Sequence, residues 1–280
     1  MTALDALPPL RDVIARFDLG ARKALGQHFL LDLNLTARIA RAGGEMEGVT
    51  AIEIGPGPGG LTRALLGTSA REVVAVERDP RFIEALADVV AASEGRLRLV
   101  QADALEVDLE ALAPAPRAIV ANLPYNVGTP LLIGWLKRIE AYEGLTLMFQ
   151  KEVVDRIVAG PRTKAYGRLA VMCQWRAHCK ALFDIPARAF TPPPKVVSAV
   201  VRLTPRAAAP GDPDFADMET VVAACFNQRR KMLRASLRSL TPDAEALISA
   251  AGLEPTARAE EIEVAGFVAL TKAWRASRAG

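Results

Sequence analysis

The chain has 280 residues, of which 51% are hydrophobic and 24% are charged, and its net charge is +3 at pH 7. This length favours one large domain plus a smaller one rather than a single small core. Charged residues interrupt every apolar run before it is long enough to cross a bilayer, which argues against a membrane protein. The first twenty residues lack the basic-then-apolar layout of a signal peptide, so we expect a cytoplasmic protein.

The three cysteines are odd in number and too few for a disulfide framework. Cys173 and Cys179 flank His178, which invites a metal interpretation. However, the spacing matches no common zinc pattern, and a fourth ligand is not evident nearby. We therefore expect buried or half-buried thiols and no metal.

Apolar runs alternate with helical patterns through the first two thirds of the chain. An N-terminal arm leads to a helix of about ten residues, which Asp32 or Asn34 is expected to cap and Gly43 to close. Strands are then predicted within residues 49–54, 71–77, 97–101, 117–122, 145–150, 180–186 and 196–205. Helices are predicted within residues 60–67, 80–93, 129–142, 151–160 and 166–177.

Continuous apolar strands that alternate with helices indicate an α/β fold with a parallel sheet covered on both faces. Residues 204–215 are rich in Pro, Ala and Gly, as in a linker, and the chain after them has helical patterns only. We therefore predict an α/β domain over residues 1–204 and a helical domain over residues 205–280.

A glycine turn, "EIGPGPGG", follows the first strand of the predicted sheet. Gly55 and the glycines after it permit a tight turn and let a ligand approach the backbone closely. Nicotinamide enzymes and methyltransferases share such turns. The pattern therefore predicts a nucleotide-like ligand without choosing between these two classes.

Acidic residues end the next two strands. Glu77 follows the glycine turn by about twenty residues, where a carboxylate can accept hydrogen bonds from both hydroxyls of a ribose. Asp103 ends the third strand, where it could accept a hydrogen bond from an adenine amino group. Either acid alone could be a solvated strand end. Together with the glycine turn they predict an adenosine moiety.

The fourth strand ends in Asn122, Leu123, Pro124 and Tyr125. A hydride-transfer enzyme gains nothing obvious from this sequence, whereas methyl transfer to an adenine N6 needs it. Asn122 Oδ1 and a backbone carbonyl of the Leu123–Pro124 bend could hold N6 so that its lone pair points at the methyl group. Tyr125 would stack on the extruded base. The alternative is that Asn122 caps the next turn and Tyr125 packs on the sheet.

Several stretches resemble the ribosomal RNA adenine N6,N6-dimethyltransferases of the KsgA type. They are "LGQHFLLD", "EIGPGPGGLT", "VERD", "QADAL", "NLPYN", "FQKEVVDRI", "YGRLAV" and "FTPPPKVVSAVVRL". The resemblance implies a Rossmann-like class I methyltransferase sheet with a small all-helical C-terminal domain. It also implies S-adenosylmethionine as cofactor. The implied substrate is a pair of adjacent adenosines near the 3′ end of 16S rRNA in an assembling small ribosomal subunit.

The same resemblance assigns roles to residues. His28 and Leu30 would line the cofactor pocket, together with Gly55, Glu77, Asp103 and Asn122. The family often has Asn where this chain has His28. Phe190 would be a second aromatic face opposite Tyr125, the alternative being a core phenylalanine beside a proline-rich turn.

A basic run is predicted to form one helix over residues 227–238. It carries Arg229, Arg230, Lys231, Arg234 and Arg238 with no acid between them. Considered alone, this basic run could be a solvent-exposed face of the helix. Beside an adenine-modifying pocket, contacts with RNA phosphates are the better interpretation.

Other functions remain open from the residues alone. The large-subunit rRNA adenine methyltransferase that confers macrolide resistance shares the sheet and a similar Asn–aromatic motif. A nicotinamide dehydrogenase is a weaker alternative. A ribosome-assembly factor that acts mainly by binding would need the same basic residues. We expect a monomer, because the sequence shows no obvious apolar interaction surface.

Overall fold

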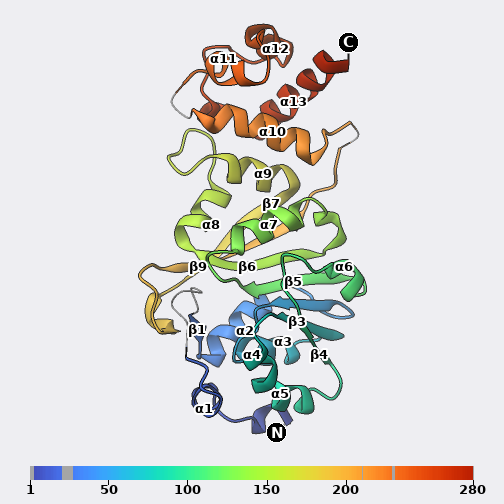
Figure 1. The fold of residues 1–280 in the computed structure, drawn as a ribbon, viewed down its shortest axis with the longest axis vertical. Coiled ribbons are helices and arrows are strands. Elements are labelled where there is room, and N and C mark those ends of the chain that lie inside the picture. The colour runs from blue at the N-terminus through green and yellow to red at the C-terminus, as the bar shows by residue number, and fades with distance from the viewer. Residues whose placement is uncertain (1–2, 21–27, 210, 229–230, 280) are drawn as a thin grey trace. The chain divides into compact units, whose positions relative to one another are not determined.

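The computed structural model describes residues 3–20, 28–209, 211–228 and 231–279 (Figure 1). The chain divides into two compact units: Met1–Val154 with Lys180–Pro205, and Asp155–Cys179 with Arg206–Gly280. The sequence had placed residues 155–179 in the α/β domain, whereas they cluster with the C-terminal helices. Long-range contacts explain the difference, because the Tyr166 hydroxyl donates to the Ile262 carbonyl at 2.8 Å and the Trp175 ring lies 5.9 Å from that of Phe215.

A seven-stranded sheet has the order β4-β3-β2-β5-β6-β9-β7. Strands β2 to β6 run parallel, and β9 pairs antiparallel with β6, so the sheet is mixed rather than wholly parallel. The strands are β2 (Thr50–Ile54), β3 (Glu72–Glu77), β4 (Leu97–Gln101), β5 (Arg117–Asn122), β6 (Gly144–Gln150), β7 (Ala177–Ile185) and β9 (Ser198–Pro205). The predicted α/β class is confirmed.

Strand order reverses at β2, which has β3 on one side and β5 on the other. In open α/β sheets, ligands bind outside the carboxyl ends of the strands at such a reversal. The residues that follow β2, β3 and β5 are the glycine turn, the acid-rich turn from Glu77 and the turn from Asn122. The topology therefore brings these three predicted features to one edge.

The helices of the first unit begin largely where the sequence predicted them. Asp32 caps α2 by accepting hydrogen bonds from the backbone of Asn34 and Leu35, and the helix ends before Gly43, as predicted. Short strands β1 (Phe29–Leu30) and β8 (Phe190–Thr191) pair antiparallel. The helices are η1 (Ala3–Ala6), α1 (Leu10–Arg16), α2 (Leu33–Ala42), α3 (Gly60–Leu66), α4 (Pro80–Ala85), α5 (Ala87–Ala92), α6 (Leu109–Leu112), α7 (Gly128–Leu136), η3 (Ile139–Ala141) and η4 (Ala187–Ala189). Helix α8 (Lys151–Val158) begins in the first unit and ends in the second.

The core of the first unit is the apolar interior of the sheet. Ile52, Val74 and Ile119 lie on neighbouring strands and are fully buried. Each such side chain stabilises the fold by about 1.5–3 kcal/mol relative to an exposed position. All five residues of β2 are buried, including Glu53, which is 1% exposed.

The described part of the second unit is mainly helical. Its elements are α9 (Arg168–Arg176), α10 (Phe215–Asn227), α11 (Leu233–Ser236), η5 (Leu237–Ser239), α12 (Ala244–Ala250), η6 (Ala259–Glu261) and α13 (Val264–Ala279). Of the three cysteines, Cys173 and Cys225 are buried and Cys179 is half-buried, and all are free thiols, as predicted. Among the described residues, no helix combines the length and hydrophobicity needed to cross a membrane.

The prediction of one basic helix over residues 227–238 was wrong. Helix α10 ends at Asn227, and Met232 is extended and forms a β-bridge with Arg258. The Leu233 N–H then donates to the Ala257 carbonyl at 2.8 Å, so this backbone pairs with a distant segment instead of continuing the helix. Lys231, Arg234 and Arg238 are exposed, while Arg229 and Arg230 lie outside the described residues.

Candidate cofactor and adenine site

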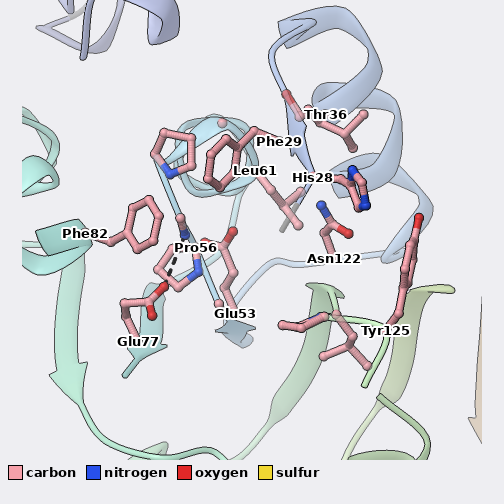
Figure 2. Close-up of a pocket in the computed structure, with 17 residues that line it drawn as sticks. His28, Phe29, Thr36, Glu53, Pro56, Leu61, Glu77, Phe82, Asn122 and Tyr125 are labelled. Atoms are coloured by element: carbon pink, nitrogen blue, oxygen red, sulfur yellow. Dashed lines mark hydrogen bonds between the residues drawn. The ribbon is translucent and has the colours of Figure 1, made fainter. Parts of the chain in front are cut away.

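Two adjoining cavities open at the carboxyl edge of β2, β3 and β5. The first has a volume of about 110 Å³ and contains most of the predicted site residues (Figure 2): His28, Leu30, Gly55, Glu77, Asn122, Leu123, Pro124 and Tyr125. The second has a volume of about 570 Å³ and is lined by Asp103 and Arg78. Gly55, Glu77 and Pro124 line both cavities, so the two lie side by side.

The glycine turn forms a wall of the first cavity. Gly55, Gly57 and Gly59 have positive φ angles of 68°, 52° and 92°, which residues with a Cβ rarely adopt. At Gly60, a Cβ would lie 2.9 Å from the Leu30 carbonyl oxygen. The turn therefore needs glycine for its own conformation and for its close packing against β1. It leaves backbone open to a ligand.

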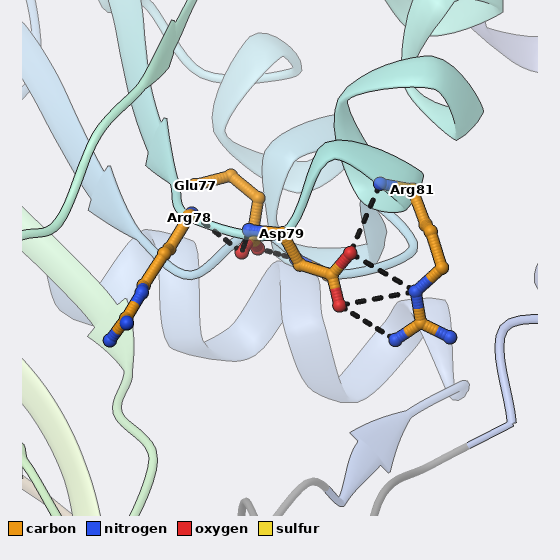
Figure 3. Close-up of polar contacts among 5 residues, drawn as sticks. Glu77, Arg78, Asp79 and Arg81 are labelled. Atoms are coloured by element: carbon orange, nitrogen blue, oxygen red, sulfur yellow. Dashed lines mark hydrogen bonds and ion pairs between the residues drawn. The ribbon is translucent and has the colours of Figure 1, made fainter.

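Glu77 lies at the end of β3 with its carboxylate turned back onto the backbone (Figure 3). Oε1 accepts hydrogen bonds from the N–H groups of Arg78 at 2.8 Å and Asp79 at 2.9 Å, and Oε2 accepts a longer one from Gly57 at 3.4 Å. Burial raises the pKa of Glu77, and the three backbone donors oppose that effect. Oε2 is the oxygen better placed to accept from a ribose hydroxyl.

Asp103 lines the second cavity and already has two partners. Its Oδ1 accepts the Leu105 N–H at 3.0 Å, and its Oδ2 lies 3.0 Å from Nη1 of Arg78. The Arg78 side chain is 80% exposed, so this ion pair is weak and a ligand can replace it. An adenine amino group could then donate to Asp103, as the sequence predicted.

Asn122 is the last residue of β5 and points into the first cavity (Figure 2). The Pro124 carbonyl accepts the N–H groups of Val127 and Gly128 and so closes the turn into α7. This use of Pro124 favours the Leu123 carbonyl as the second acceptor for an adenine N6. Residue Val127 occupies the N-cap of α7 without a side-chain hydrogen bond, so Asn122 does not cap that helix.

Tyr125 and His28 lie together at the side of the cavity. Their ring centroids are 5.7 Å apart, and the Tyr125 hydroxyl is 2.8 Å from Oγ of Ser198. Burial raises the pKa of Tyr125. His28 Nδ1 lies 2.7 Å from the Pro192 carbonyl oxygen, which can only accept, so Nδ1 donates this hydrogen bond.

The rings of Phe190 and His28 meet edge-on with centroids 6.4 Å apart. Phe190 is 3% exposed and packs in the hydrophobic core, and neither cavity includes it among its lining residues. In this conformation the ring presents no open face to a base. Its role opposite Tyr125 therefore stays a prediction that requires His28 or the β8 segment to move.

Two site residues were missed by the sequence analysis. Glu53 lines the first cavity from the middle of β2, and Arg78 lines the second beside Asp103. The available signal for Glu53 was an acid inside the apolar run "TAIEI". For Arg78 the signal was its place directly after the expected ribose-binding acid.

The site fits S-adenosylmethionine. The glycine turn offers a backbone cradle, Glu77 and Asp103 offer acceptors at two consecutive strand ends, and Asn122 faces the same cavity. Fold and site together define a class I S-adenosylmethionine-dependent methyltransferase.

Comparisons with known proteins identify the family. The sequence model of ribosomal RNA adenine dimethylases matches residues 19–275. Ribosomal RNA small subunit methyltransferase A of Rhodospirillum rubrum is 61% identical over 269 residues, which cover 96% of this chain and 93% of that protein. The Azorhizobium caulinodans protein of the same name is 57% identical over 284 residues, covering 100% and 97%. The chain therefore belongs to the ribosomal RNA adenine dimethylase family, as its motifs predicted.

Solved structures agree with the fold. A dimethyladenosine transferase from Plasmodium falciparum matches with a TM-score of 0.73 at 23% identity, covering 87% of this chain and 96% of that one. The 23S rRNA methyltransferase ErmE matches with a TM-score of 0.66 at 29% identity, covering 88% and 99%. The predicted enzyme class and its cofactor, S-adenosylmethionine, are thus confirmed, and the nicotinamide alternative is set aside.

Proposed function

We propose that this enzyme dimethylates N6 of two adjacent adenosines near the 3′ end of 16S rRNA during assembly of the small ribosomal subunit. The observation that carries the proposal is the placement of Asn122 and Tyr125 at one cavity with the glycine turn. The near-identical length and 57–61% identity of relatives named for the small subunit support this substrate over 23S rRNA. We also infer a monomeric, cytoplasmic enzyme.

The chemistry required of the protein is mainly alignment. The N6 lone pair of adenine is delocalised into the ring and is a poor nucleophile. Asn122 Oδ1 and the Leu123 carbonyl accept hydrogen bonds from N6 and draw it toward tetrahedral geometry, while Tyr125 stacks on the base. The bound cofactor supplies an electrophilic methyl group. Water takes the proton that N6 loses after transfer, so a strong general base is not required.

Phosphate contacts are proposed for the basic residues of the C-terminal unit. Lys231 and Arg234 are exposed, and Arg234 lies 3.5 Å from Glu245, whose side chain is 62% exposed. Such an exposed pair is worth little, so a phosphate can replace the carboxylate. Arg229 and Arg230 are expected to contribute in the same way.

Labelled cofactor and small subunits from a strain that lacks the modification provide the test. The rRNA is digested after incubation, and the labelled nucleoside and its position are identified. Dimethyladenosine at two adjacent positions near the 3′ end of 16S rRNA is the expected product. Label confined to 23S rRNA would instead support the resistance-type activity.

An Asn122→Ala variant separates chemistry from binding. We expect methyl transfer to fall by about 100- to 1000-fold, the usual cost of losing one polar contact to the reacting group, with subunit binding retained. Normal subunit assembly with this inert variant would show that the protein acts mainly as an assembly factor.

A further inference from the structure

The side chain of His28 closes one end of the small sheet formed by β1 and β8. These strands pair antiparallel with Phe29 opposite Thr191, so the next residues to face each other are His28 and Pro192. Pro192 begins a run of three prolines, which have no backbone N–H and cannot donate to β1. Nδ1 of His28 donates a hydrogen bond to the Pro192 carbonyl oxygen at 2.7 Å. The last link between the two segments is therefore a side-chain contact.

The two strands are anchored, whereas the imidazole is held by few contacts. Leu30 in β1 and Phe190 in β8 are 6% and 3% exposed and belong to one hydrophobic core cluster. Separating the strands would expose both side chains to water, which the hydrophobic effect opposes. The His28 ring is half-buried, and among the described residues its one hydrogen-bond partner is Pro192. The side chain of His28 can therefore turn aside while the strands stay in place.

The imidazole lies against both aromatic rings that are expected to hold the target base. Its centroid is 5.7 Å from that of Tyr125 with 34° between the rings, and 6.4 Å from that of Phe190 with 80° between them. Both separations are those of aromatic rings in contact. His28 also lines the first cavity together with Asn122, which is expected to bind adenine N6 (Figure 2). The imidazole thus takes the place in which a target adenine would stack.

The first cavity has too little room for its two expected occupants. Its volume is about 110 Å³, whereas sites for small molecules have about 300–1,000 Å³. The methyl-bearing end of the cofactor and the target base must meet there. Phe29 and Phe82, two other rings of the lining, are 8% and 1% exposed and pack on each other with centroids 5.7 Å apart, so they form a fixed wall. A side chain has to make room, and the half-buried ring of His28 is the best placed to do so.

We infer that His28 holds the place of the target adenine in the free enzyme and is displaced when the base enters. The inference rests on the proposed methyl transfer to adenine N6. Entry of the base replaces the contact of the imidazole with Tyr125, breaks the hydrogen bond to Pro192 and turns the ring out of the cavity. His28 therefore sets a cost for base entry, and this cost is absent from a chain without the ring.

A variant without the ring should be faster than the wild type. His28→Asn removes the imidazole and keeps a side chain that can donate to the Pro192 carbonyl. In single-turnover assays with saturating cofactor and unmodified small subunits, we expect its kcat/KM to rise by about 3- to 10-fold, the usual worth of one aromatic ring contact. His28→Phe keeps a ring against Tyr125 and should stay at or below the wild-type value. A gain is diagnostic, because loss of a purely structural contact would not accelerate the reaction.

Three controls separate this role from effects on folding and on cofactor binding. His178→Asn makes the same chemical change at the other histidine of the chain, which is exposed and lies in the second unit, and it should leave the rate unchanged. Calorimetry gives the Kd of S-adenosylmethionine for each variant, so that rates are compared at equal cofactor occupancy. Urea unfolding should show that His28→Asn is no more stable than the wild type, although it is faster.

Two results would overturn the inference. A His28→Asn rate equal to or below that of the wild type would show that the imidazole does not obstruct the base. Equal gains in His28→Asn and His28→Phe would show that a ring at this position does not occupy the place of the base. The labelled nucleoside and its position are identified separately in the same samples. Label on 23S rRNA would refute the proposed substrate, and the order of the variants would still be measured on that RNA.

Discussion

Replacing Glu53 with glutamine should make the protein progressively more stable relative to the wild type as pH rises from 6 to 8. The pKa of Glu53 is raised from about 4.5 to about 8 in the folded chain, chiefly by burial. A group whose folded pKa is raised in this way binds its proton more tightly in the native state. The contribution of that proton to the free energy of unfolding is fully present below pH 4.5 and is lost as pH rises toward 8.

The magnitude follows from the same shift. Each pKa unit corresponds to about 1.4 kcal/mol, so the wild-type protein should lose about 2–3 kcal/mol relative to Glu53→Gln between pH 6 and pH 8. The glutamine amide adds a buried N–H₂ group that needs partners, which costs about 1–3 kcal/mol independently of pH. The slope of the difference with pH, and not its value at one pH, is therefore the test.

Urea unfolding followed by Trp135 fluorescence isolates the relevant unit. Trp135 lies in α7 of the first unit, whereas the other two tryptophans, Trp175 and Trp274, lie in the second. Phenylalanine at the latter two positions leaves one reporter in both proteins compared. Glu106→Gln removes an exposed carboxyl and controls for net charge. A difference that stays flat from pH 6 to pH 8 would refute the reasoning, because Glu53 would then be ionised in the native protein.

Three further predictions concern the remaining parts of the site. Tyr125→Ala should lower kcat/KM by about 10- to 100-fold in single-turnover assays, because stacking on the base is lost. Tyr125→Phe loses only the contact with Ser198 and should stay within about threefold of the wild type. Equal losses in the two variants would implicate the hydroxyl. Gly60→Ala should weaken cofactor binding in calorimetry, because its Cβ would lie 2.9 Å from the Leu30 carbonyl oxygen. The control Gly134→Ala meets nothing within 4 Å and should be neutral or stabilising. Equal cofactor affinities of the two variants would refute the packing argument. Arg234→Ala should reduce the salt dependence of subunit binding by about one phosphate contact in filter-binding assays, and an unchanged slope would remove Arg234 from the interface.

The sequence predicted those parts of the site that follow from local pattern. The strand ends could be read because apolar runs stop at Asn122, Glu77 and the residues before Asp103, and parallel strands bring their carboxyl ends to one edge. The N-terminus of α2 could be read because Asp32 satisfies free N–H groups within its own turn. In each case the residues that decide the structure are close together in the sequence.

The wrong predictions concern segments whose structure is decided by residues far away in the sequence. The basic run has a helical pattern, but Met232 and Leu233 pair with the backbone near Arg258, about 25 residues further along the chain. Residues 155–179 have the same pattern as the helices before them, and only contacts such as that from Tyr166 to Ile262 assign them to the C-terminal unit. Contacts with distant segments determine the structure of the basic run and of residues 155–179. The residue pattern within each segment does not reveal these contacts.

Glu53 was missed for a third reason, which concerns how buried polar groups are interpreted. Most buried polar side chains of the sheet connect elements: Thr50 accepts from Arg71 at 2.8 Å, and Ser198 lies 2.8 Å from the Tyr125 hydroxyl. Such groups stabilise the fold and need no ligand. Glu53 has one hydroxyl donor and faces a cavity, so it destabilises the strand that carries it at neutral pH. A charged residue that breaks the apolar pattern of a strand and has only one hydrogen-bond donor is expected at a functional position. This contrast, which requires both the sequence pattern and the contacts, is what separates Glu53 from Thr50 within one strand of five residues.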